Sequence, residues 1–140
     1  MIAISHIDVP IKKVFHPLVR ACVNAVLKHR KKEISIVACS DEYILQMNKQ
    51  SLNHDYYTDI ITYHYENTPN NLEAELLISV ERIAENAITN KIPFEHELAR
   101  IIIHGCLHLN GYDDKTPKLK KEMTNQEDKY LTEVSNLLNK

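Results

Sequence analysis

Apolar and polar positions along the chain follow two repeats, one typical of strands and one typical of helices. Segments rich in β-branched, apolar and aromatic residues predict four strands, at residues 2–7, 33–39, 58–65 and 72–78. Apolar residues at intervals of three and four predict five helices, at residues 17–29, 41–52, 80–90, 95–109 and 117–138. The fourth strand is helical by composition, and its assignment depends on its position after the turn-like residues 66–71.

The order of these elements predicts the fold class. Strands and helices alternate in the first part of the chain, and three helices follow the last strand. This order favours an α/β (α+β) fold, with a small mixed sheet of about four strands covered by about five helices. A length of 140 residues fits a single domain over residues 1–140. Only two glycines and five prolines occur, which argues against long flexible linkers.

Composition narrows the class of protein further. Hydrophobic residues make up 44% and charged residues 26% of the chain, which argues against disordered and collagen-like proteins. No apolar run approaches the roughly 18 residues of a membrane span, and the first residues lack the pattern of a signal peptide. Three scattered cysteines (Cys22, Cys39 and Cys106) indicate reduced thiols. We therefore expect a cytoplasmic protein with no membrane partner.

Positive charge is concentrated near the N-terminus. Residues 1–40 contain seven Lys or Arg against two Asp or Glu, whereas the other hundred contain ten against seventeen. The cationic residues on or just after the first predicted helix are Arg20, Lys28, Arg30, Lys31 and Lys32. Such a cluster can contact the phosphates of a nucleic acid, although a solvated helix end whose cations suit the helix dipole is the simpler account.

The segment HGCLHLNGYDD, residues 104–114, contains the candidate metal-binding residues. His104 and His108 are four residues apart on a predicted helix, so their rings project from one face and can reach one metal ion. Gly111 ends the helix, and Asp113 or Asp114 can then supply a third ligand. The alternative is a pair of ordinary histidines on a helix flank. Cys106 points to the opposite side of the helix, and we interpret it as a core residue.

The residue after the first histidine limits the reaction class. A zinc peptidase of the H-E-x-x-H type has its general base there, whereas this chain has Gly105, which cannot accept a proton. Hydrolysis would then depend on a metal-bound hydroxide or on a base from another segment. Two histidines and a carboxylate also suit non-haem iron oxygenases, but nothing in the sequence indicates an oxo-acid cosubstrate.

Several segments together resemble the YbeY family of bacterial metal-dependent endoribonucleases, or rRNA maturation factors. HGCLHLNGYDD is similar to the family's H-G-x-L-H-L-x-G-Y-D-H signature, and HELARIIIHG leads into it as the family's helix does. TDIITY at 58–63 resembles the family's T-D-V-L-S-F strand, and ELLIS at 75–79 resembles its G-D-I-x-I-S segment. Met123 and Glu127 fit the trailing M-x-x-x-E, so the resemblance spans roughly residues 33–130.

The resemblance implies one zinc ion per chain, held by three residues. His104 and His108 match the first two family ligands, and Asp114 stands where the family has its third histidine. A carboxylate oxygen also binds zinc, at about 2.0–2.2 Å, but it makes the site harder and more suitable for manganese or a similar ion. Asp113 matches the family's aspartate. We expect it to orient a metal ligand or the turn without binding the metal itself.

A second departure concerns the loop before residue 58. The family has an arginine there that is thought to help activity on RNA, whereas this chain has Leu52. His54 is the nearest residue that can approach a phosphate, although a solvated turn histidine is the simpler account. Thr58 and Asp59 either line the site or hold the loop. Glu97 shares a helix face with His104, but a surface acid is the simpler account.

The expected function is a metal-dependent endoribonuclease that hydrolyses single-stranded RNA in ribosomal RNA processing. In that interpretation His104, His108 and Asp114 are catalytic through the bound metal and its water. The expected partners are ribosomal RNA and small-subunit components, with no DNA. One alternative is a metal-stabilised ribosome-assembly factor that binds RNA without cutting it. The other is a hydrolase of a small or peptide substrate, against which Gly105 argues.

Overall fold

Four strands form one sheet in the computed structural model, which describes residues 1–52 and 58–138. The strands are β1 (Ile2–His6), β2 (Lys32–Cys39), β3 (Ile60–Thr68) and β4 (Asn71–Ser79). Their order across the sheet is β1-β2-β4-β3, with β2 parallel to both of its neighbours and β3 antiparallel to β4. The predicted small mixed sheet is confirmed.

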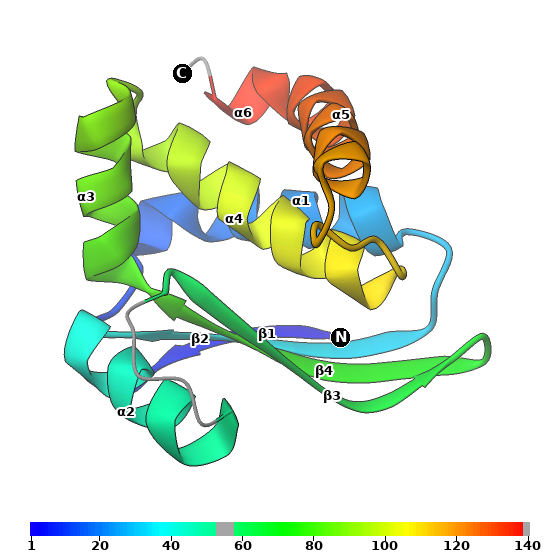
Figure 1. Cartoon of the computed structure of the whole chain (residues 1–140), viewed down its shortest axis with the longest axis horizontal. Helices are drawn as coiled ribbons and strands as arrows, with labels where there is room; N and C mark the ends of the chain where they lie inside the picture. The colour runs from blue at the N-terminus through cyan, green and yellow to red at the C-terminus, as the bar shows by residue number, and fades with distance from the viewer. Residues whose placement is uncertain (53–57, 139–140) are drawn as a thin grey trace.

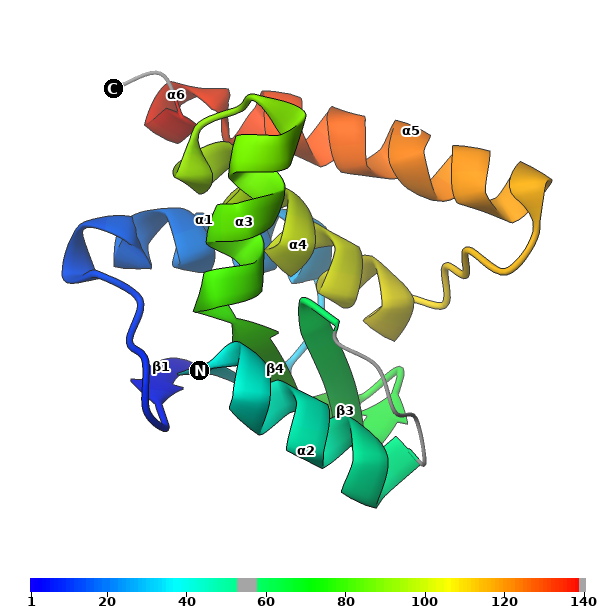
Figure 2. The same ribbon diagram turned by 60° about the vertical axis from the view of Figure 1, so that its left-hand side comes forward.

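Helices cover both faces of this sheet, but unequally (Figure 1). The helices of the described residues are α1 (His16–Leu27), α2 (Asp41–Leu52), α3 (Val80–Asn90), α4 (Phe94–Leu109), α5 (Pro117–Glu133) and α6 (Ser135–Leu138), with a 3-10 turn η1 at Lys13–Phe15. Helix α2 lies alone against one face, while α4 lies over the other face with α1 and α5 beside it (Figures 1 and 2). None of the described helices is long and apolar enough to cross a membrane.

Two elements differ from the sequence prediction in their extent. Strand β3 continues to Thr68 instead of ending near residue 65, because a bulge between His64 and Glu66 restores its pairing with the start of β4. The turn is therefore shorter than predicted. The final predicted helix is interrupted at Val134, whose φ of −99° and ψ of 8° leave helical geometry and separate α5 from α6.

The alternation of side chains along β4 divides the core into two parts. Ala74, Leu76 and Ile78 belong to the large cluster between the sheet and helices α1, α4 and α5, whereas Leu77 belongs to the small cluster beneath α2. Helix α4 is the centre of the large cluster, since ten of its residues are buried. The apolar pattern of residues 95–109 therefore fixes α4 on the sheet.

Gly105 allows α4 to lie close to β3 and β4. A Cβ atom at this position would be 2.7 Å from Ile60 Cδ1 and 2.8 Å from Leu76 Cδ2, closer than two carbon atoms pack. His104, the residue before Gly105, consequently lines the same cleft as Ile60, where β3 begins.

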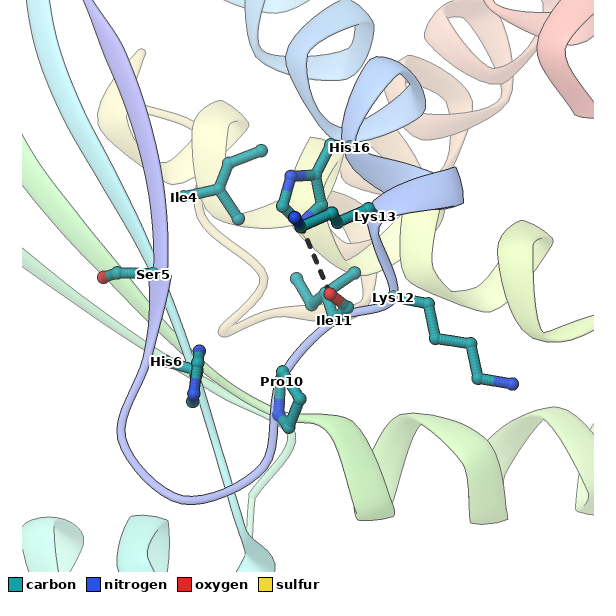
Figure 3. A pocket seen from close by; sticks show the side chains of 8 residues that line it. All are labelled: Ile4, Ser5, His6, Pro10, Ile11, Lys12, Lys13 and His16. Carbon is teal, nitrogen blue, oxygen red and sulfur yellow. Dashed lines mark hydrogen bonds between the residues drawn. The ribbon is translucent and has the colours of Figure 1, made fainter.

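A separate cavity of about 290 Å³ lies between the end of β1 and the start of α1. Ile4, Ile11 and His16 surround its upper part in Figure 3, with His16 Nε2 3.3 Å from the carbonyl oxygen of Ile11. His6 and Pro10 lie at its other end. This cavity shares no lining residue with the cleft described next, which contains the two histidines of α4.

Candidate metal site

His104 and His108 present their rings to each other from successive turns of α4. Their Nε2 atoms are 3.0 Å apart, and their ring planes meet at 83°. The helix ends directly afterwards, where Gly111 adopts a φ of +95° and the backbone N–H of Tyr112 donates to the Leu107 carbonyl. This end turns the chain back toward the histidines, as the sequence predicts for a glycine at that position.

The returning segment places a carboxylate beside the two rings. Asp114 Oδ2 is 3.6 Å from His104 Nε2, and one ligand atom from each of His104, His108 and Asp114 lies within 4.8 Å of the others. Among the described residues this is the group of His, Cys, Asp and Glu side chains that can hold a metal ion. Two imidazole nitrogens and one carboxylate oxygen form a donor set that zinc accepts.

Hydrogen bonds at the far side of each ring decide which nitrogen faces this group. His104 Nδ1 is 2.7 Å from Glu127 Oε2, and His108 Nδ1 is 3.0 Å from the carbonyl oxygen of Tyr112. Both partners are acceptors, so each Nδ1 carries a hydrogen and donates it. In neutral rings both Nε2 lone pairs then point at each other and at a carboxylate. Either a proton on one ring or a metal ion between them relieves the repulsion of these lone pairs, and with Asp114 beside them the residues fit a metal ion.

The pKa of His104 reflects the same surroundings. Burial lowers this pKa, but the hydrogen bond and the charge of Glu127 outweigh that effect, with smaller contributions from Asp114 and Asp59. The net result is a pKa above the ordinary histidine value. A proton therefore competes with a metal ion for this ring more strongly than it would for an exposed histidine.

The group opens into a cleft of about 770 Å³ between α4, β3 and the segment after α4. Its lining residues are Asn48, Thr58, Asp59, Ile60, Ile61, Thr62, His104, His108, Asp114 and Lys115. The structure thus brings the predicted residues Thr58 and Asp59 to the same cleft as the histidines. Burial raises the pKa of the Asp59 carboxyl, and the charge of His104 opposes this rise.

Other predicted residues lie elsewhere. Asp113 accepts a hydrogen bond from the backbone N–H of Lys115 at 2.9 Å, so it holds the turn and is not part of the three-atom group. Cys106 is fully buried, which confirms its assignment to the core. His54 and the side chain of Leu52 lie outside the described residues.

None of the five residues of the basic cluster lines the cleft. Most of its members contact the protein itself. Arg20 donates to the Ile2 carbonyl, Lys32 donates to the Leu27 carbonyl, and Lys28 forms an exposed ion pair with Glu133. Arg30 donates to Asn67, Thr68, Leu109 and Asn110, and Lys31 is exposed.

Sequence reasoning gave no role to three residues near the site. Glu127 and Arg100 form an ion pair behind His104, and Lys115 brings a cation into the cleft. The M-x-x-x-E spacing pointed to Glu127 without indicating a role. The interpretation of Glu97 as a surface acid is wrong: only 5% of this residue is exposed, because it faces inward on α4, and burial raises its pKa.

Comparison with known proteins places the chain in a family. A family model described as Endoribonuclease YbeY matches residues 3–135. The chain belongs to the YbeY family. Proteins named Endoribonuclease YbeY from Cytophaga hutchinsonii and Bacteroides fragilis are 42% identical over 117 residues and 47% identical over 109 residues. These matches cover 81% and 78% of this chain, and 82% and 78% of the relatives.

The fold of the YbeY chain also matches a solved structure. The solution structure of a Thermotoga maritima protein gives a TM-score of 0.69 at 30% identity, with coverage of 96% of this chain and 89% of the other. The resemblance to the YbeY family and the predicted mixed α/β fold are confirmed. The predicted enzyme class is confirmed at the level of the family, whose members are metal-dependent endoribonucleases and therefore hydrolases.

Proposed function

We propose that the chain is a metal-dependent endoribonuclease that hydrolyses single-stranded RNA during ribosomal RNA maturation in the cytoplasm, on precursors of the small ribosomal subunit. His104, His108 and Asp114 hold one divalent ion, which we take to be zinc. The observation that supports this proposal is the convergence of two Nε2 lone pairs and a carboxylate within 4.8 Å in an open cleft. Membership of the YbeY family supplies the substrate class.

When bound, the ion would supply a water of lowered pKa and an electrophile that stabilises charge on the scissile phosphate. The residues of the chain prepare this arrangement. Tyr112 and Glu127 hold the two rings so that Nε2 faces the cleft, and Asp114 adds a negative charge that offsets part of the ion's charge.

Lysine and arginine side chains bind the RNA in this proposal, one near the metal site and the others farther from it. Lys115 lines the cleft and lies next to Asp114 in sequence, so its ammonium contacts a phosphate near the scissile bond. Thr58 and Thr62 add hydroxyl groups to the same cleft, and Asp59 lies beside them on the substrate side. The basic cluster of Arg20, Lys28, Arg30, Lys31 and Lys32 contacts more distant backbone phosphates, with Arg20, Lys28 and Lys31 exposed and the other two partly buried.

Cleavage of a single-stranded ribosomal RNA fragment tests the proposal. The purified protein is compared with a His104→Ala variant prepared identically, each with zinc and with a chelator. Cutting by the wild type alone, abolished by the chelator, is the expected result. Equal cutting by both proteins would identify a contaminating nuclease. No cutting by a fully metallated wild type would contradict the proposal and favour a metal-stabilised assembly factor.

A further inference from the structure

Helix α5 contributes a buried carboxylate to the far side of the histidine pair. Glu127 is only 7% exposed, and its two oxygens have different partners. Oε1 accepts from Arg100 Nη1 at 2.8 Å, and Oε2 accepts from His104 Nδ1 at 2.7 Å. Arg100 and His104 are four residues apart on α4, so Glu127 joins two successive turns of that helix. Figure 2 shows α5 running above α4.

The second histidine has a weaker partner. His108 Nδ1 contacts the neutral carbonyl of Tyr112 at 3.0 Å, within its own helix end. A charged acceptor at 2.7 Å forms a stronger hydrogen bond than a neutral one, and it makes the opposite ring nitrogen a better electron donor. The two rings are therefore oriented by different parts of the molecule, His104 by α5 and His108 by the turn that follows α4.

We propose that Glu127 is a positioning residue, which holds His104 in the tautomer with hydrogen on Nδ1 and thereby turns the Nε2 lone pair toward the metal ion. Arg100 fixes Glu127 in this role by occupying its other oxygen. Because the ion is part of the proposed function, this inference rests on that proposal. It adds that metal affinity depends on α5, which supplies none of the three ligands.

The variant Glu127→Gln separates this role from simple packing. Glutamine has nearly the same shape, but it has one acceptor oxygen where glutamate has two, and both of its neighbours are donors. The charged guanidinium of Arg100 takes the single oxygen, since charge-assisted hydrogen bonds are the stronger ones. The amide NH₂ then faces His104 Nδ1 and favours a lone pair there. The hydrogen moves to Nε2, where it blocks the metal ion.

Asp128→Asn is the matched control. Asp128 is the next residue of α5 and also accepts from Arg100, at 3.1 Å, but it does not contact His104. The variant therefore removes one negative charge, as Glu127→Gln does, and weakens another contact of the same arginine without touching the ring. Zinc affinity is measured by competition with a chromophoric chelator. We expect Glu127→Gln to weaken zinc binding about 10- to 100-fold and Asp128→Asn to change it by less than about threefold.

The tautomer is read directly from the metal-free protein. Two-bond ¹H–¹⁵N correlations of the histidine rings, recorded at a pH where they are neutral, should show His104 with hydrogen on Nδ1 in the wild type and on Nε2 in Glu127→Gln. Wild-type His104 with hydrogen on Nε2 would overturn the inference even if the variant fails to fold. Unchanged zinc affinity in a folded Glu127→Gln would overturn it as well. A wild type that binds no metal would instead contradict the proposed function.

Discussion

At the scale of single residues, the turn after α4 separates the roles of two adjacent acids. Asp113 accepts from the Lys115 N–H, while Asp114 reaches His104. We expect Asp114→Ala to lose most bound zinc after dialysis, because it removes one of the three proposed ligands. Asp113→Ala should keep close to one ion per chain. Metal per chain, measured by atomic emission, checks both variants, and equal retention would contradict the assignment of Asp114.

Gly105 is constrained by space and not by backbone angle. Its α-carbon faces Ile60 Cδ1 and Leu76 Cδ2, so the methyl group of Gly105→Ala must displace buried side chains or move α4 away from the sheet. We expect a loss of about 1–3 kcal/mol in the free energy of unfolding, as is typical of an overpacked core. Urea denaturation measures this loss, and a wild-type midpoint would show that α4 tolerates the displacement.

At the scale of elements, the start of α2 depends on a residue 32 positions earlier. Ser40 Oγ accepts from the Tyr43 N–H, while Ser40 N and Oγ both donate to the Asp8 carboxylate at 2.8 and 2.7 Å. Replacing Ser40 with alanine should therefore cost about 1 kcal/mol, the usual effect of a lost helix cap.

The Ser40 hydrogen bonds hold the pKa of Asp8 below its ordinary value, although burial opposes them. A lowered folded-state pKa stabilises the fold above the unfolded pKa of about 3.9, and this contribution is lost as pH falls through the folded value. We expect Asp8→Asn to be less stable than the wild type at pH 7, with the difference shrinking below pH 4. Urea midpoints between pH 3 and 7 test this, and a pH-independent difference would contradict it.

Arg30 joins elements that are far apart in sequence. It donates to Asn67 Oδ1 at 2.6 Å, to the Thr68 carbonyl at 3.0 Å and to the Leu109 carbonyl at 3.2 Å, so it ties the β3–β4 hairpin to the end of α4. We expect Arg30→Ala to lower unfolding free energy by about 1–2 kcal/mol. Lys31→Ala should leave stability unchanged and weaken RNA binding modestly. Denaturation and RNA titrations at two salt concentrations distinguish these effects.

These contacts mark the limit of sequence reasoning. The histidine pair, the helix stop and the returning carboxylate were predictable because they lie within eleven residues and follow from helix geometry. Arg30 and Glu127 were not, since their partners are 23 to 80 residues away and depend on which helix faces meet. Glu97 was misjudged for the same reason: helical spacing shows which residues share a face, but not what covers it.

At the scale of the whole molecule, bound metal should change stability because its proposed ligands come from both α4 and the segment leading to α5. A ligand that binds only the folded state adds about 2.7 kcal/mol at a concentration 100-fold above its Kd. For a chain of this size we expect a rise in melting temperature of roughly 10 °C on adding zinc to the chelator-treated protein. His104→Ala should show little rise, and calorimetry measures both.

The rise in melting temperature on adding zinc should depend on pH because of His104, whose pKa is raised in the folded protein. Without metal, protonated His104 beside Glu127 stabilises the fold below the unfolded pKa of about 6.5, and this contribution is lost as pH rises through the folded value. With metal, the proton must leave before Nε2 binds, so metal stabilisation grows over that same range. Melting temperatures with and without zinc should therefore diverge as pH rises from 6 to 8. Parallel curves would show that His104 does not exchange its proton for the metal ion.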